Sequence, residues 1–339
     1  MTKDLLLEAL PKLEARRADR RAFLRGAGVA TVAGGLMLSG CGDSNNNGVN
    51  VVPGSGTTPP LGTGSANPTN PGPALSDPDV LNFALNLEYL EAQFYAYAAT
   101  GAGLSASAVT GTGTQGAVTG GRRVNFTDPL VAAYAREIAG DEVAHVLFLR
   151  QELGSAAVAQ PAIDIGSSPT SAFSLAAQAA GLVPAGQAFD PYASDDNFLL
   201  AAFLFEDVGV TAYKGAAPLI TNRTFVEASA GILAAEAYHA GLVRTALFRR
   251  SVATPSLVNA TEAISNARDS LDGPADLDQG IAPVGGAANI VPTDANAVAF
   301  SRSAAQVLNI VYLNRASVSR GGFFPNGVNG AVNTSANNA

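Results

Sequence analysis

The two histidines of this chain repeat one local pattern, which limits the possible fold more than any other sequence feature. His145 follows Glu142 by three residues, and His239 follows Glu236 at the same spacing. On an α-helix, residues three apart lie on one face, so each pair can direct a carboxylate and an imidazole toward one point. A single pair would be weak evidence, but the repetition predicts two helices that face a common centre.

Two further glutamates lie in apolar segments at matching positions. Glu88 is followed after seven residues by Tyr95, and Glu206 is followed after seven residues by Tyr213. Glu88 also belongs to a stripe with the four-three spacing of an inward helix face, whose other members are Leu81, Leu85, Ala92 and Tyr95. A buried carboxylate costs several kcal/mol unless it is paired or bound to a cation. The pattern favours a metal centre over a metal-free buried network, which would need many hydrogen-bond donors.

Capping and stop signals divide the chain into helices. Ser76 and Pro78 begin a first helix at about 79–99, Pro129 begins a second that ends before Gly154, and Asp195 begins a third. The other predicted helices are the fourth long one, 223–250, and three shorter ones at 171–181, 255–271 and 301–313. No stretch shows the alternation of a sheet. The predicted fold class is all-α, an antiparallel four-helix bundle with a long crossover between helices two and three.

The domain organisation follows from the same signals. The bundle is expected over residues 76–272, and a mostly irregular C-terminal extension with one short helix over 273–339. A hydrophobic fraction of 47% is ample for a core of this size.

The N-terminal residues 1–40 are typical of an export signal. Arg20 and Arg21 precede a weakly apolar stretch that is too short to span a bilayer about 30 Å thick, as in a twin-arginine signal. Cys41 is the only cysteine and ends a lipobox-like segment, where bacterial lipoproteins are cleaved and acylated. An ordinary cleaved signal with an incidental Cys41 is the alternative. Residues 41–75, rich in Gly, Pro and Asn, are expected to form a flexible tether to a membrane in the cell envelope, in the periplasm or at the outer membrane.

The charge balance excludes one large class of partners. The formal net charge is −8, and the basic residues outside the signal form only short pairs such as Arg122 with Arg123. Nucleic acid binding needs a basic face that neutralises phosphates. We therefore expect no nucleic acid partner.

One Glu from each of two helices and a Glu-x-x-His from each of the other two form the ligand set of ferritin-like dimetal carboxylate bundles. Residues 79–250 resemble that superfamily. Segments such as "LNFALNLEYLEAQFY", "DEVAHVLFLRQELG" and "FEDVGVTAYKGAA" resemble exported bacterial ferritin-like domain proteins related to plant desiccation-related proteins. The resemblance implies three roles: Glu142 and Glu236 bridge two metals, His145 and His239 bind one each, and Glu88 and Glu206 are terminal ligands.

Several neighbouring residues leave alternatives open. Glu91 lies one turn after Glu88 and is the alternative ligand on the first helix, although only Glu88 aligns Tyr95 with Tyr213. Asp207 is expected to be an outer group near the ligands or a surface residue. Tyr95 and Tyr213 fit plain packing as well as a hydrogen-bonding or redox role.

The residues around Glu142 and His145 allow two further predictions. Asp141 is expected to point away from the site, while Val146 and Leu149 continue the buried stripe past it. Gly140 predicts a close helix contact or a local distortion.

The ligand types indicate the metal. Hard oxygen ligands with two imidazoles suit iron best, with manganese or a mixed iron–manganese pair as alternatives to it. Two such metal ions predict an oxidoreductase of ferroxidase or peroxidase type that uses Fe(II), O2 or H2O2. The competing hypothesis is a non-catalytic envelope protein, associated with stress or desiccation, in which the metals only stabilise the fold.

Overall fold

The computed structural model describes residues 75–339. The export signal with Arg20 and Arg21, the lipidation candidate Cys41 and nearly all of the tether lie outside these residues. The expectations about export, acylation and tethering therefore stay predictions.

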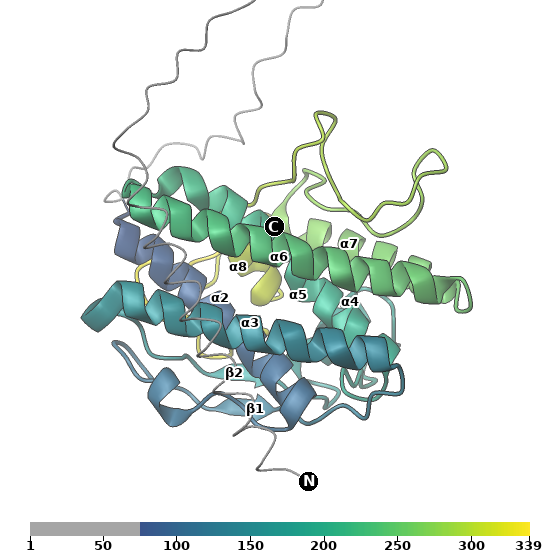
Figure 1. Cartoon of the computed structure of the whole chain (residues 1–339), viewed down its shortest axis with the longest axis horizontal. Helices are drawn as coiled ribbons and strands as arrows, with labels where there is room; N and C mark the ends of the chain where they lie inside the picture. Colours follow the sequence, from purple (N-terminus) through teal and green to yellow (C-terminus); the bar gives the residue numbers. More distant parts are fainter. Residues whose placement is uncertain (1–74) are drawn as a thin grey trace, which may run out of the picture. The chain divides into compact units, whose positions relative to one another are not determined.

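Four long helices form the bundle that the sequence predicted (Figure 1). They are α2 (Asp77–Thr100), α3 (Pro129–Leu153), α5 (Asp195–Ala216) and α6 (Arg223–Ser251). Helix α2 packs along α3, and α5 packs along α6. The connection between the two pairs, residues 154–194, is the long crossover of the predicted fold class.

The helix ends follow the capping signals in the sequence. At the start of α2, the hydroxyl of Ser76 accepts from the amide of Asp79, and the carboxylate of Asp79 accepts from the amide of Ser76. Gly101 ends this helix with a φ of 83°, a left-handed conformation that glycine adopts without strain. Asp128 caps α3 by accepting from the amide of Leu130.

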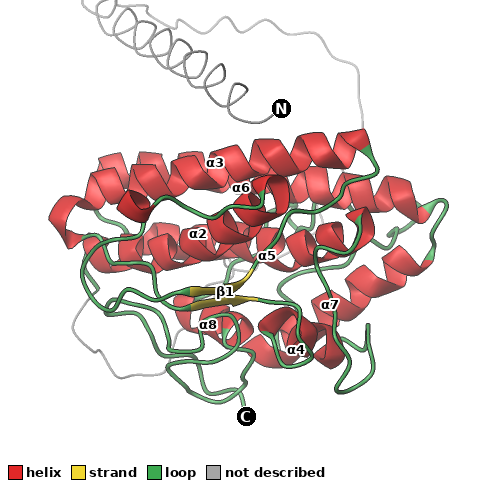
Figure 2. Ribbon diagram, turned by 90° about the horizontal axis from the view of Figure 1, so that it is seen from below, coloured by secondary structure: helices red, strands yellow, loops and turns green. Residues whose placement is uncertain are grey.

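The helices α2 and α5 form a middle layer (Figure 2). On one side they contact α3 and α6; on the other they face the short helices α4 (Ala172–Ala179), α7 (Ser256–Asp272) and α8 (Ala304–Val311). Because α2 and α5 are covered on both sides, most of their residues are buried. This explains why both segments are apolar nearly all round instead of having one polar face.

The structure adds one element that the sequence did not predict. Strand β1 (Val118–Gly120) pairs in parallel with β2 (Ile163–Ile165), with Val118 opposite Ile163. Each strand has three residues and lies in a loop region, too short for a period of two to be visible. The remaining elements are the single-turn 3₁₀ helices η1 (Ala106–Ala108), η2 (Gly154–Ala156) and η3 (Ala217–Leu219).

The C-terminal extension is part of the core as well as a covering. The amide side chain of Asn86 on α2 donates to the carbonyl of Asn329 and accepts from its backbone amide, at 2.8 and 3.0 Å. Phe323 contacts Phe173 and Phe205 in the interior, with ring centroids 5.0 Å apart in each pair. Among residues 75–339, no helix combines the length and the apolar character needed to cross a membrane.

Candidate metal centre

The structure brings all six residues of the predicted ligand set together in the middle of the bundle. They fall into two groups that could each hold a metal ion, with donor atoms within 4.8 Å of one another. The first group is Glu88, Glu142, His145 and Glu236; the second is Glu142, Glu206, Glu236 and His239. Glu142 and Glu236 belong to both groups, which is the arrangement that two bridging carboxylates require.

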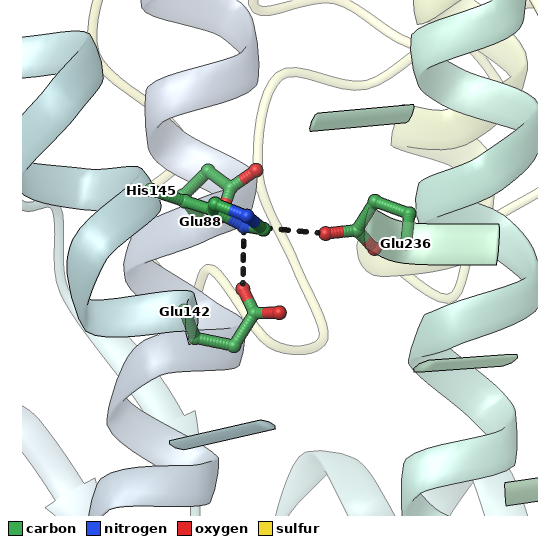
Figure 3. A group of neighbouring side chains, drawn as sticks. All are labelled: Glu88, Glu142, His145 and Glu236. Atoms are coloured by element: carbon green, nitrogen blue, oxygen red, sulfur yellow. Dashed lines mark hydrogen bonds and ion pairs between the residues drawn. The ribbon is translucent and has the colours of Figure 1, made fainter. Parts of the chain in front are cut away.

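His145 is the centre of the first group (Figure 3). Its Nδ1 lies 3.2 Å from Glu88 Oε2, 3.7 Å from Glu142 Oε2 and 3.5 Å from Glu236 Oε1. These carboxylates come from three different helices, α2, α3 and α6. The His145 side chain is 12% exposed, whereas the three glutamates are fully buried.

His239 has the corresponding place in the second group. Its Nδ1 lies 3.0 Å from Glu142 Oε1 and 3.6 Å from Glu206 Oε2. The two imidazole rings have their centroids 6.1 Å apart, so each ring borders its own group. Both histidines therefore present Nδ1 to Glu142, one of the two carboxylates that the groups share.

Tyr95 and Tyr213 are hydrogen-bonding residues and not only packing residues. The hydroxyl of Tyr95 donates to Glu206 Oε1, and the hydroxyl of Tyr213 donates to Glu88 Oε1. Each tyrosine thus holds the glutamate of the opposite helix in the middle layer. These two reciprocal hydrogen bonds between α2 and α5 explain why the Glu-to-Tyr spacing is the same on both helices.

Of the two candidate ligands on α2, Glu88 belongs to the first donor group, whereas Glu91 belongs to neither group. Glu91 is nevertheless only 6% exposed and lies near the shared carboxylates. A Cβ atom at Gly209 would lie 2.4 Å from Glu236 Oε2 and 3.5 Å from Glu91 Oε1. Gly209 therefore leaves the space in which both carboxylates approach α5. A glycine three residues after Glu206 in an apolar helix is the sequence signal for this approach.

Asp207 is a buried residue, so the expectation of a surface position was wrong. Its Oδ2 accepts from Arg244 at 2.9 Å and from Arg268 at 3.2 Å, and the Asp207 side chain is 2% exposed. These two arginines lie on α6 and α7, and Asp207 therefore links the bundle to the layer of short helices α4, α7 and α8, the third layer. No local sequence pattern indicates these buried ion pairs, because their partners lie far apart in the chain.

Two predictions about the residues next to Glu142 were wrong. Asp141 contacts the site, since its Oδ2 lies 3.3 Å from Nε2 of His239, and it is half-exposed on the outer side of that ring. Gly140 is exposed and no atom lies within 4 Å of a Cβ placed there, so it marks neither a close contact nor a distortion. Val146 and Leu149 are buried, as the stripe predicted.

The pKa values in the cluster depend on burial and on the two imidazoles. Burial raises the pKa of Glu88 to about 8, although the charge of His145 opposes this shift. Burial also raises the pKa values of Glu206 and Glu236. At Glu142 burial is outweighed by the two adjacent imidazoles, which lower its pKa to about 2.

The pKa values of both imidazoles are raised. Burial alone would lower the pKa of His239, but a hydrogen bond with Asp141 and the nearby carboxylate of Glu142 raise it to about 11. The pKa of His145 is likewise raised against burial, first by the charge of Glu88. Without a metal the cluster therefore holds several protons, which cations would displace on binding.

The unpaired atoms of the cluster indicate that it fits metal ions. Both carboxylate oxygens of Glu142 and of Glu236, one oxygen of Glu206 and Nδ1 of His239 are buried without a hydrogen bond. Such atoms normally have a partner, because an unpaired buried polar group costs about 1–3 kcal/mol. Four carboxylates and two imidazoles are a suitable donor set for iron or manganese.

Comparisons with known proteins agree with this geometry. The family model of the ferritin-like domain matches residues 76–249. Ferritin-like catalase Nec2 of Nesocodon mauritianus is 27% identical over 269 residues, which cover 76% of this chain and 85% of that protein. Desiccation-related protein PCC13-62 of Craterostigma plantagineum is 30% identical over 240 residues, which cover 67% of this chain and 75% of that protein. No solved structure gives a significant match.

Proposed function

Because this chain belongs to the ferritin-like domain family, as its motifs predicted, we propose that it is a dimetal oxidoreductase that reduces hydrogen peroxide. The observation that carries the proposal is the pair of overlapping donor groups with unpaired buried atoms. The name of the relative Nec2, a ferritin-like catalase, supports peroxide as the substrate. Iron is the metal we propose first, and manganese or a mixed pair is the alternative.

Each of the six residues has a definite place in this proposal. Glu142 and Glu236 would hold both metals, His145 and Glu88 the first, and His239 and Glu206 the second. When bound, a pair of iron or manganese ions supplies the two electrons that hydrogen peroxide takes up.

The chain's own residues would orient the ligands and hold a proton. Tyr213 and Tyr95 fix the carboxylates of Glu88 and Glu206 by their hydrogen bonds. Before metal binds, the raised pKa of Glu88, about 8, keeps a proton on this carboxyl near neutral pH, and metal binding would release that proton. Burial of the remaining carboxylates excludes bulk water from the cluster.

The test combines metal analysis with peroxide turnover. Full-length protein should contain two metal ions per chain and should consume added hydrogen peroxide. Glu142→Ala should lose both properties because Glu142 belongs to both donor groups. Glu137→Ala is the matched control, since Glu137 is an exposed glutamate of the same helix. Protein without bound metal would contradict the proposal.

A second candidate function is a metal-stabilised protein without turnover. The similarity to a desiccation-related protein favours it, and so does the origin of the donors on four helices, which metal ions would cross-link. Two metals per chain with no consumption of peroxide and no oxidation of Fe(II) would favour this function over the first.

We also propose that the protein is a lipoprotein of the cell envelope. The proposal rests on Arg20, Arg21 and the lipobox-like segment that ends at Cys41. Cells grown with labelled palmitate should incorporate the label into the wild-type protein and not into Cys41→Ser. Equal labelling of both would contradict acylation at this residue.

A further inference from the structure

Two apolar cavities lie between the middle layer and the third layer, on the opposite side of α5 from α6. The outer cavity has a volume of about 40 Å³ and lies among α4, α5, α7 and α8. The inner cavity has a volume of about 20 Å³ and lies among α2, α5, α8 and Phe323. Leu204 and Ile310 line both cavities, so their side chains form the wall between the two. A rotamer change of Leu204 would connect them.

The outer cavity offers no free charge to a ligand. Its lining is apolar apart from Arg268, and this guanidinium already donates to Asp207, Asp278 and the carbonyl of Phe203. The exposed Ala179 lies at its rim, so the cavity borders solvent. An ion or a strongly hydrated molecule would lose its water here without gaining partners.

The inner cavity is lined by Glu91 and Gly209, two neighbours of the metal centre. Glu91 is the only polar side chain in its lining and, within residues 75–339, makes no hydrogen bond to another residue. Gly209 lines the same cavity, and a Cβ placed on it would lie 2.4 Å from Glu236 Oε2. A small molecule in this cavity would therefore lie beside Glu91 and against Gly209, the residue of α5 that the Glu236 carboxylate approaches.

We propose that the inner cavity binds dioxygen and that the outer cavity is its path to and from solvent. An ordered water needs two to four polar partners, and hydrogen peroxide needs no fewer, whereas this cavity offers one carboxyl group. A nonpolar diatomic molecule needs none and fits a volume above the roughly 10–15 Å³ that one water requires. The inference rests on the proposed function: dioxygen is the product when two peroxide molecules give O2 and two H2O, or the oxidant of Fe(II).

Paramagnetic relaxation by dissolved dioxygen tests the cavities without any turnover. The sample is full-length protein loaded with diamagnetic Zn(II), with labelled methyl groups, under dioxygen pressure. The methyl groups of Ile310 and Val311 should relax several-fold faster than those of Val131 and Ile138, which are also almost fully buried but line neither cavity. Equal relaxation in both sets would overturn the proposal.

Cavity-filling variants give a second measurement. Ala201→Leu fills the outer cavity and Val311→Ile the inner one, and each should slow oxidation of Fe(II) by dioxygen several-fold. Oxidation by hydrogen peroxide should be unchanged, because that molecule takes another route. The matched controls Ala234→Leu and Val252→Ile are exposed and should change neither rate.

The outcomes separate this proposal from the proposed function. If both variants slow the two oxidants equally, or slow neither, the cavities are not a dioxygen path. If the wild-type protein oxidises no Fe(II) with either oxidant, the proposed function fails, and the methyl relaxation contrast still decides whether dioxygen enters the cavities.

Discussion

Gly209 determines how closely α5 approaches the carboxylates of the metal centre. A methyl group at this position would lie 2.4 Å from Glu236 Oε2, closer than real Cβ contacts, so Glu236 would have to move. Gly209→Ala should therefore weaken metal binding by at least about tenfold, in the range found when the surroundings of metal ligands are disturbed. Titration of the metal-free protein with Fe(II) under argon measures this affinity.

Gly231→Ala is the control for that change. Gly231 lies on the exposed face of α6, and no atom lies within 4 Å of a Cβ placed there. Alanine should stabilise the helix at this position by about 0.5–1 kcal/mol and leave metal affinity unchanged. If both alanine variants bound Fe(II) equally well, the close approach at Gly209 would have no role in holding Glu236.

Asp269 predicts a pH dependence of stability that is separate from the metal centre. Burial, followed by the charge of Asp278, raises its pKa to about 7 in the folded protein. The folded state then holds a proton that the unfolded state releases near pH 4. The stability from this group is present below about pH 4 and is lost as the pH rises through about 7.

Asp269→Asn should remove this contribution. Its unfolding free energy, relative to wild type, should increase from pH 4 to pH 8, as measured by urea unfolding at several pH values. Glu227→Gln changes an exposed carboxylate on α6, away from this group of aspartates, and serves as the control. A constant difference between Asp269→Asn and wild type across this range would contradict the shifted pKa.

Helix positions were largely predictable from the sequence because the caps are local. Ser76, Asp128 and Gly101 form their capping bonds within two to four residues, so their signals are visible without the fold. The attachment of the third layer was harder to predict from the sequence. This attachment depends on the ion pairs of Asp207 with the buried Arg244 and Arg268, and these pairs are set by tertiary packing.

Arg302 shows how strongly the C-terminal extension is attached to the helices. Its guanidinium donates to Asp272 at 2.5 Å, to Asp278 at 2.6 Å and to the hydroxyl of Thr211 on α5 at 3.1 Å. Arg302→Ala would leave two buried carboxylates without this partner and should destabilise the protein by about 3–5 kcal/mol. Chemical denaturation measures the loss.

Arg320→Ala is the matched control, because Arg320 is exposed in the same extension. Its effect should stay within about 0.5 kcal/mol. Similar stabilities of the Arg302 and Arg320 variants would show that the extension contributes little to the folded core.

At the scale of the molecule, the candidate site was predictable because its ligands follow a near-symmetric repeat. Residues Glu88 and Tyr95 on α2 correspond to Glu206 and Tyr213 on α5, and the histidine motifs on α3 and α6 also match. The departures from symmetry were not predictable. Glu91 faces its counterpart position, Gly209, and Asp141 contacts His239 from a neighbouring helix, so both depend on how helices pair.

Metal removal should weaken the whole bundle, because the donors come from α2, α3, α5 and α6. A ligand present at about 100 times its dissociation constant stabilises the folded state by about 2.7 kcal/mol. For a domain of this size, that corresponds to a fall of about 5–10 °C in the midpoint of thermal unfolding when the metal is chelated. Calorimetry with and without chelator measures the shift, and returning Fe(II) under argon should restore it. In Glu142→Ala, chelator should have no effect, since that carboxylate belongs to both donor groups. An unchanged midpoint in the chelated wild-type protein would mean that the cluster is stable as a network of protons and ion pairs alone.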